Sequence, residues 1–270
     1  MSDLRSRQGA SQDLRVAALT DRGQVRDANE DAFHADLAAP ERAVTHGHLF
    51  LVADGMGGHA AGEVASATAR DEVLRDYYAA PLGADADPRE GLRRAFLAAN
   101  REIIEGRGRD ANHHDMGTTC TAVVVRDGRF WVAHVGDSRA YRWRAGRLQR
   151  LTRDHNWAEE LLEAGRIDPS EAMTHLGRHM LTRALGIDRD LRADIHEARV
   201  LEPGDRLLLC SDGLTGVVSE EEITAILGVD DLARASTELI ETANRAGGPD
   251  NITVVLIAAG DPIDARQSRT

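Results

Sequence analysis

The sequence has few cysteines, no long apolar run and no excess of basic residues, and each shortage excludes a class of protein. Its two cysteines, Cys120 and Cys210, lie in apolar, strand-like runs, so we expect buried free thiols and not a disulfide framework. No apolar run approaches the length of a membrane-spanning helix, and residues 1–13 lack the apolar core of a signal peptide. These shortages predict a cytoplasmic protein with no membrane segment in this chain.

Acidic residues outnumber basic residues by 45 to 33, which gives a formal net charge of −12. Nucleic-acid surfaces are built from clustered basic residues, so this balance argues against a nucleic-acid partner and suits a protein that concentrates cations. With 270 residues and 42% hydrophobic content, the chain can bury a sizeable core. We expect one domain over residues 14–260, between flexible tails at 1–13 and 261–270.

Hydrophobic periodicity predicts blocks of strands followed by pairs of helices. Strand runs separated by Asp-Gly and Ala-Gly turns fill residues 118–151, which indicates an antiparallel meander. Further strands are expected at 191–200, 206–210 and 252–258, and helices at 62–78, 87–103, 219–228 and 231–246. Residues 156–180 change to short helices with little apolar surface, as in an excursion over the surface. Two packed sheets with helices outside is the economical architecture.

Acidic residues recur where strand-like runs begin or end. The apolar run at 49–53 stops at Asp54 and then turns into glycines, and similar acids stand elsewhere in the chain. A single Asp-Gly pair is more often a turn than a site, but repetition favours a site. The acids in such positions are Glu30, Asp31, Asp54, Asp137, Asp212 and Asp250.

If the strands that carry these acids are neighbours, several carboxylates meet at one edge and repel each other unless cations neutralise them. Oxygen ligands without Cys or His partners favour Mg²⁺ or Mn²⁺ over Zn²⁺. Two such ions sharing one carboxylate suit phosphoryl chemistry. Arg26 is a natural complement, because a guanidinium binds phosphate in a bidentate fork.

Seven short motifs in order resemble the metal-dependent Ser/Thr protein phosphatases, the type 2C or PPM family, in bacterial form. Each motif alone is weak, but seven in the same order are specific. The resemblance covers residues 14–260 and rests on VRDANED (25–31), ADGMGG (53–58), MGTT (116–119), GDSR (136–139), LTRALG (181–186), CSDGL (210–214) and GPDNIT (248–253).

This resemblance implies an α+β fold with a central antiparallel β-sandwich of two sheets flanked by helices, in four α-β-β-α layers. Residues 14–260 would form a single phosphatase catalytic domain, with a flap at about 156–180 beside the active site. The cofactors would be Mn²⁺ or Mg²⁺, as two ions at one end of the sandwich and a third, weaker ion.

The resemblance also assigns the metal ligands. Asp54 would bridge the two metals. Glu30 and the backbone carbonyl of Gly55 would complete one site, and Asp212 and Asp250 the other.

Other positions have supporting roles in the family. Asp31 would orient metal-bound water, and Arg26 would bind the substrate phosphate. Asp137 matches a ligand of the third metal, together with Asp212, although a plain turn acid is an equal interpretation. Arg139 and Arg183 are expected to be structural ion-pair partners.

The sequence departs from many eukaryotic relatives at Met56. Those relatives have a histidine directly after the Asp-Gly pair, which is proposed to protonate the leaving oxygen. His59 is the nearest candidate for that general acid, but a histidine at a helix start is more often structural or exposed. Metal-bound water is the alternative proton source.

The function implied is hydrolysis of phosphoserine and phosphothreonine monoesters in proteins by direct attack of a water that bridges two metals. No serine or cysteine stands in a nucleophile motif, which favours this direct route. Expected partners are phosphorylated proteins, including a bacterial Ser/Thr kinase and its substrates, and the expected state is a monomer. The alternative is a catalytically weak regulatory or phospho-sensing module on the same fold, whose usual mark is loss of a metal acid. A nuclease is disfavoured by the acidic charge.

Overall fold

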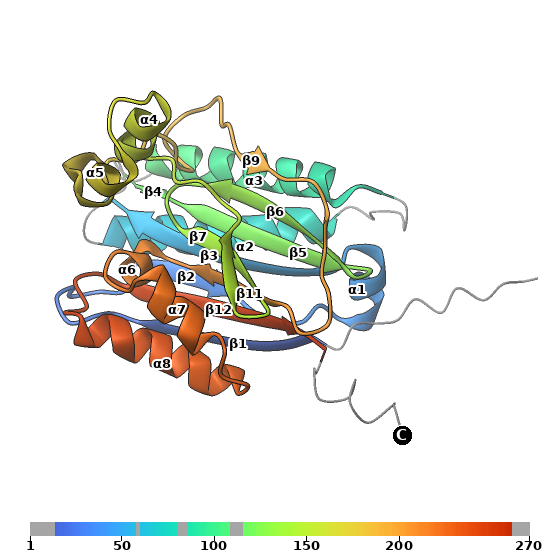
Figure 1. The fold of residues 1–270 in the computed structure, drawn as a ribbon. Helices are drawn as coiled ribbons and strands as arrows, with labels where there is room; N and C mark the ends of the chain where they lie inside the picture. Colours follow the sequence, from blue (N-terminus) through green and yellow to red (C-terminus); the bar gives the residue numbers. More distant parts are fainter. Residues whose placement is uncertain (1–13, 58–59, 80–85, 109–115, 261–270) are drawn as a thin grey trace, which may run out of the picture.

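The computed structural model describes residues 14–57, 60–79, 86–108 and 116–260. Two antiparallel sheets pack face to face, and helices cover the outer face of each (Figure 1). The predicted α+β class and its four α-β-β-α layers are confirmed. None of the helices in these ranges combines the length and apolar character needed to cross a bilayer.

The first sheet has five antiparallel strands in the order β1-β12-β11-β7-β8. Helices α7 (Glu220–Ile226) and α8 (Leu232–Arg245) cover its outer face. Its strands are β1 (Leu14–Asp21), β12 (Ile252–Ala259), β11 (Arg206–Cys210), β7 (Arg139–Arg144) and β8 (Arg147–Arg150).

The second sheet has the order β10-β6-β5-β3-β2, with β4 paired to β3 and β9 paired to β6. Helices α2 (Ala60–Ala79) and α3 (Pro88–Arg107) cover its outer face, and the short α1 (Pro40–Thr45) links β2 to β3. Its strands are β10 (Arg199–Val200), β6 (Arg129–Val135), β5 (Cys120–Arg126), β3 (His48–Met56), β2 (Asp31–His34), β4 (Gly117–Thr118) and β9 (Asp194–Ile195).

Strand β3 is buried on both faces, which explains the apolar run before Asp54. Phe50 and Val52 pack between the two sheets, while Leu49 and Leu51 pack under α2 and α3. A strand covered on both faces needs apolar residues at every position and not at alternate ones. Cys120 and Cys210 are buried free thiols, as predicted.

The region from 118 to 151 is not one meander, and that prediction is wrong. The turn at Asp127-Gly128 joins β5 to β6 in the second sheet, whereas β7 and β8 belong to the first sheet. Both hairpin turns have positive φ at their central residues, with 51° at Asp127 and 48° at Ala145. The chain crosses from the second sheet to the first at residues 136–138. The prediction failed because the hydrophobic pattern and the turn residues identify hairpins but do not say which sheet each hairpin joins.

The prediction of one long strand at residues 191–200 is also wrong. Only the two-residue strands β9 and β10 form there, paired at the edge of the sheet with β6. The segment between them is partly exposed, so it cannot supply a continuous buried strand.

Residues 156–180 pass over the surface, as the sequence indicated. They form α4 (Trp157–Glu163), α5 (Pro169–Thr174) and the 3₁₀ helix η2 (Leu176–His179), which lie beyond the sheet end in Figure 1. The base of this segment is closed by two backbone bonds, from Trp157 N to the Met180 carbonyl (2.9 Å) and from Thr182 N to the His155 carbonyl (2.8 Å).

Candidate metal centre

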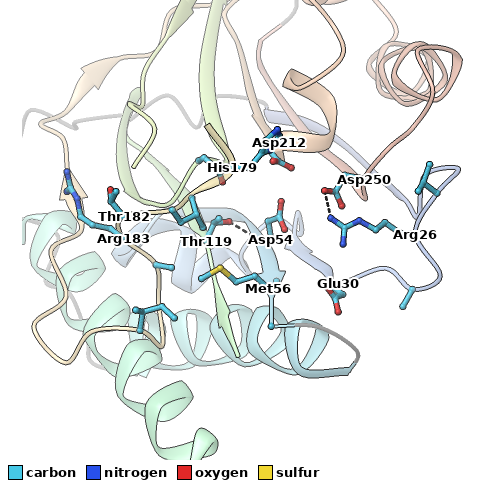
Figure 2. A pocket seen from close by; sticks show the side chains of 18 of the residues that line it. Arg26, Glu30, Asp54, Met56, Thr119, His179, Thr182, Arg183, Asp212 and Asp250 are labelled. Carbon is cyan, nitrogen blue, oxygen red and sulfur yellow. Dashed lines mark hydrogen bonds and ion pairs between the residues drawn. The ribbon is translucent and has the colours of Figure 1, made fainter. Parts of the chain in front are cut away.

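The predicted acids meet at one end of the sandwich, where strands of both sheets begin or end. Asp54, near the end of β3, is the register partner of Asp31 at the start of β2. Asp212 begins the short helix α6 (Asp212–Thr215), with Ser211 between it and the end of β11, and Asp250 comes just before β12. Asp54, Asp212 and Asp250 line a cavity of about 720 Å³, shown in Figure 2, whereas Asp31 does not line it. The predicted site residues that line it are Arg26, Glu30, Asp54, Gly55, Asp137, Asp212 and Asp250.

The backbone of Asp54 is fixed on both sides by Thr118 and Thr119. Its N–H donates to Thr119 Oγ1 (2.9 Å), and its carbonyl accepts from Thr119 N (2.9 Å) and Thr118 Oγ1 (2.8 Å). The Thr119 hydroxyl also bonds the Ser138 hydroxyl at 2.7 Å. These hydrogen bonds fix the backbone of Asp54, and its carboxylate points into the cavity (Figure 2).

Asp31 joins the two sheets. Its Oδ2 accepts hydrogen bonds from Ser211 Oγ (2.8 Å), directly after β11, and from Thr253 Oγ1 (2.6 Å), on β12 of the first sheet. Its Oδ1 is buried and has no hydrogen-bond partner among the described residues. Burial raises the pKa of Asp31 to about 7; the two hydroxyls oppose this shift, and the neighbouring Asp212 and Asp250 add to it. A buried oxygen of this kind is suited to accept a hydrogen bond from an ordered water.

Crowding raises the pKa of several other acids. Burial and then the charges of Asp31 and Asp212 raise the pKa of Asp54 well above its ordinary value. Burial and the charge of Asp250 raise the pKa of Asp212. Bare carboxylates in this cluster therefore resist ionisation, and a bound divalent cation is the partner that would stabilise their charged forms.

The donor set fits a hard cation, since the acids and the Gly55 carbonyl offer oxygen atoms. Over residues 14–57, 60–79, 86–108 and 116–260, no three Asp, Glu, His or Cys side chains converge closely enough to form a complete cage for one ion.

Two glycines let three segments meet beside Glu30. A Cβ on Gly55 would collide with the carbonyl oxygen of Gly62, and a Cβ on Gly62 would lie 2.8 Å from Glu30 Cδ. Gly55 N donates to the Glu30 carbonyl at 3.1 Å. Gly55 and Gly62 are therefore required by the close approach of neighbouring segments at the site.

Asn251 is a site residue that the sequence did not single out. Its side chain accepts from Glu30 N (2.8 Å) and donates to the carbonyls of Arg22 (2.9 Å) and Ala28 (2.8 Å). It thus holds the loop that carries Arg26 and Glu30 against the start of β12. Ser211, Thr253 and Thr119 were missed in the same way. Each lies in one of the motifs quoted above: Thr119 in MGTT, Ser211 in CSDGL and Thr253 in GPDNIT. Their place in these motifs was the available signal that they belong to the site.

Arg26 is paired with Asp250, with 2.7 Å between its terminal nitrogen and Asp250 Oδ2. This hydrogen bond raises the pKa of Arg26. Asp250 Oδ1 accepts from Asn251 N at 2.8 Å, so both oxygens of this carboxylate have partners. A cation at Asp250 would compete with Arg26 and free the guanidinium for a phosphate.

Asp137 lies at the crossing between the sheets and is only 8% exposed. Burial and the charges of Asp212 and Asp154 raise its pKa well above the ordinary value. Both interpretations of Asp137, as third-metal ligand and as turn acid, remain predictions. Arg139 pairs with Asp154 at 2.7 Å and Arg183 with Asp194 at 3.0 Å, as expected of structural ion pairs.

Met56 lines the cavity beside Asp54 (Figure 2). His59 lies outside the described residues, so its assignment as general acid stays a prediction. His179, on η2, also lines the cavity and was not singled out from the sequence.

Comparison with known proteins agrees with this geometry. The Protein phosphatase 2C family profile matches residues 17–252. The Ser/Thr protein phosphatase PstP of Mycobacterium tuberculosis is 41% identical over 244 residues, which cover 90% of this chain and 44% of PstP. The chain thus spans less than half the length of that relative. Protein phosphatase PhpP of Streptococcus pneumoniae is 34% identical over 249 residues, covering 92% of this chain and 98% of PhpP.

Solved structures are also similar. The catalytic domain of PstP in complex with two manganese ions has a TM-score of 0.79 and 38% identity, covering 92% of this chain and 99% of that domain. The PPM Ser-Thr phosphatase MsPP from Mycobacterium smegmatis, in complex with cacodylate, has a TM-score of 0.78 and 41% identity, and the match covers 91% of this chain and 98% of the MsPP chain. The chain therefore belongs to the protein phosphatase 2C family.

Proposed function

We propose that this chain is a Mn²⁺- or Mg²⁺-dependent phosphatase that hydrolyses phosphoserine and phosphothreonine monoesters in proteins. The observation that carries the proposal is the convergence of Asp54, Asp212 and Asp250 with Arg26 on one cavity. The two manganese ions in the similar PstP domain support the same cofactor here.

When bound, two divalent cations would lower the pKa of a water, hold phosphate oxygens and stabilise charge in an in-line displacement. In this proposal Asp54 would hold both ions, with Glu30 and the Gly55 carbonyl on one ion and Asp212 and Asp250 on the other, since all five residues line one cavity. Arg26 would bind the remaining phosphate oxygens in its fork.

In this proposal Asp31 orients the attacking water. Ser211 and Thr253 hold its Oδ2, and its Oδ1 has no hydrogen-bond partner among the described residues. In the reaction, the water oxygen gives up a proton and bonds to phosphorus, the ester P–O bond breaks, and the serine or threonine oxygen leaves with a proton. His59 is one proposed donor of that proton, and water at the metal centre is the alternative.

Direct attack by water fits the residues of the cavity. Cys120 and Cys210 are fully buried in the core and do not line it. The Thr119 hydroxyl does line it, but this hydroxyl is occupied by Asp54 N and Ser138. No serine or cysteine stands among the described residues that line the cavity, which favours direct attack by water over a covalent phospho-enzyme.

The proposed substrates are phosphorylated proteins, among them a bacterial Ser/Thr kinase and the proteins that it phosphorylates. This extension rests on the sequence resemblance, and a monomeric state is proposed with it. The proposed cytoplasmic location rests on the few cysteines and on the lack of a long apolar run or signal-peptide core.

The deciding experiment is hydrolysis of a phosphothreonine peptide with Mn²⁺ and with a chelator. We expect turnover that requires Mn²⁺ and is lost in Asp54→Asn and Asp212→Asn. The matched control is Asp36→Asn, an exposed acid outside the cavity, which should keep its activity. Turnover that survives the chelator would contradict the mechanism. No turnover in the unmodified chain would favour the phospho-sensing alternative.

A further inference from the structure

The cavity has a second wall that is unlike the acid wall. The lining opposite the carboxylates is partly apolar and comes from β3 and from residues 181–187, although His179, Thr182 and Arg183 also line the cavity there. In Figure 2, Met56 lies between Asp54 and the segment that carries Thr182 and Arg183. The apolar residues of this wall are Met56, Leu181, Ala184 and Ile187.

Met56 and Ile187 cover the same spot on β4. The tips of both side chains lie close to the position that a Cβ on Gly117 would take, with Met56 Cε at 2.8 Å and Ile187 Cδ1 at 3.1 Å. Gly117 thus lets two flexible apolar side chains lie side by side over bare backbone. Together they form a continuous apolar surface that opens into the cavity.

Ile187 is exposed, yet its backbone is held firmly. Its side chain is 51% exposed, although an isoleucine gains most from full burial. The buried Asn100 of α3 accepts from Gly186 N (2.8 Å) and donates to the Asp188 carbonyl (2.7 Å). One buried amide therefore clamps the residues on both sides of Ile187, which presents the side chain in a fixed place.

The guanidinium of Arg183 on this side of the cavity already has a carboxylate partner. Arg183 lines the cavity, but its guanidinium is paired with Asp194 at 3.0 Å. Met56 and Ile187 therefore offer an apolar surface beside the polar side chains of Thr182 and His179, and such a surface favours an apolar partner.

We propose that Ile187 and Met56 form a specificity pocket for a large apolar side chain next to the phosphorylated serine or threonine of the substrate. The inference rests on the proposed function, since one continuous cavity joins this wall to the acid centre. With the phosphate at Asp54 and Arg26, the substrate backbone must leave the centre through the cavity mouth. A neighbouring side chain then reaches the apolar wall. The fixed backbone at Ile187 lowers the entropy lost on binding.

The test uses two sets of phosphothreonine peptides. In one set the residue directly before the phosphothreonine is Leu, Gly or Lys, in the other set the residue directly after it is varied in the same way, and the rest of the peptide is constant. We expect the kcat/KM of the Leu peptide to exceed that of the Gly peptide by about tenfold at one of these positions. In Ile187→Ser this ratio should fall to about one. The ratio is taken within each variant, so a general loss of activity cancels.

The matched control is Val200→Ser on β10, where an apolar side chain of similar exposure, 52%, lies outside the cavity. It should keep the full Leu preference. Ile187→Glu should reverse the preference toward the Lys peptide at the same position, which a merely structural residue would not do.

A Leu preference that persists in Ile187→Ser would overturn the inference, as would equal kcat/KM for all peptides. Hydrolysis of p-nitrophenyl phosphate, which has no neighbouring residue, separates the two proposals. If p-nitrophenyl phosphate and the peptides are hydrolysed but the Leu and Gly peptides have equal kcat/KM, only the specificity pocket is refuted. If no phosphate ester is hydrolysed, the proposed function and the pocket both fail.

Discussion

The acid wall of the cavity is fixed by the core of the sandwich, whereas the facing wall combines Met56 of β3 with residues 181–187, which lie outside the named strands and helices. Asp54 and Asp31 are held by hydroxyl groups from neighbouring strands and from both sheets. On the other side, Ile187 is 51% exposed and Leu176 in the flap is 87% exposed. The difference separates two tasks. Chemistry needs groups fixed within fractions of an ångström, and recognition needs side chains that a partner can reach.

The largest effect is expected at the centre of the acid wall, from Asp54→Asn. Loss of the proposed bridging carboxylate should lower kcat/KM on a phosphothreonine peptide on the order of a thousandfold, or about 4 kcal/mol. Without metal the same substitution replaces a carboxyl group by a neutral amide in a crowded, buried cluster. We therefore expect the midpoint of thermal unfolding in a chelator to stay the same or rise. A lower midpoint would mean that Asp54 is needed for folding.

A core substitution should separate the two regions by stability. Leu51→Ala removes a fully buried side chain of β3 beneath α2 and should cost about 2–5 kcal/mol of unfolding free energy. Leu176→Ala in the flap should stay within about 0.5 kcal/mol. Urea unfolding measures both. Equal losses would show that the flap packs as tightly as the sandwich.

The hydroxyl support of Asp31 is tested by Thr253→Val. This change keeps the shape of the side chain but removes the 2.6 Å bond to Asp31 Oδ2. Partners of this kind are worth about tenfold to a hundredfold in metal affinity, and we expect such a loss in Mn²⁺ titrations by calorimetry. Thr174→Val, an exposed flap residue, is the control. Unchanged affinity in Thr253→Val would show that Asp31 needs no support.

The smallest effect is the pH dependence of Mn²⁺ binding. A carboxyl with a raised pKa keeps its proton at lower pH, and the pKa of Asp31 is raised to about 7 while that of Asp54 is also raised. Binding must displace these protons, so affinity should fall several-fold from pH 8 to pH 6. Calorimetry in two buffers with different ionisation heats should detect proton release. The absence of release would contradict the raised pKa values.

Much of the fold and of the acid wall could be predicted from the sequence. The apolar run before Asp54 marks a strand buried on both faces, and acids at the ends of such strands meet once the strands pack together. The capping box at Ser219 and the turn at Asp127 are local signals that the structure repeats.

The remainder depends on contacts between distant segments. No local pattern shows that Ser211 and Thr253 reach Asp31 across the sandwich, or that the chain changes sheets at residues 136–138. The clamp of Asn100 on the residues beside Ile187 joins positions more than 80 residues apart, with separations of 86 and 88. Sequence periodicity therefore predicted the strands better than the facing wall of the cavity.

The most direct test of the metal centre is anomalous diffraction at the manganese edge from crystals grown with Mn²⁺. We predict two strong peaks bridged by the carboxylate of Asp54, one beside Glu30 and the Gly55 carbonyl and the other beside Asp212 and Asp250. Arg26 should then have left Asp250. Peaks that do not contact Asp54, or no ordered manganese in the cavity, would contradict the assignment.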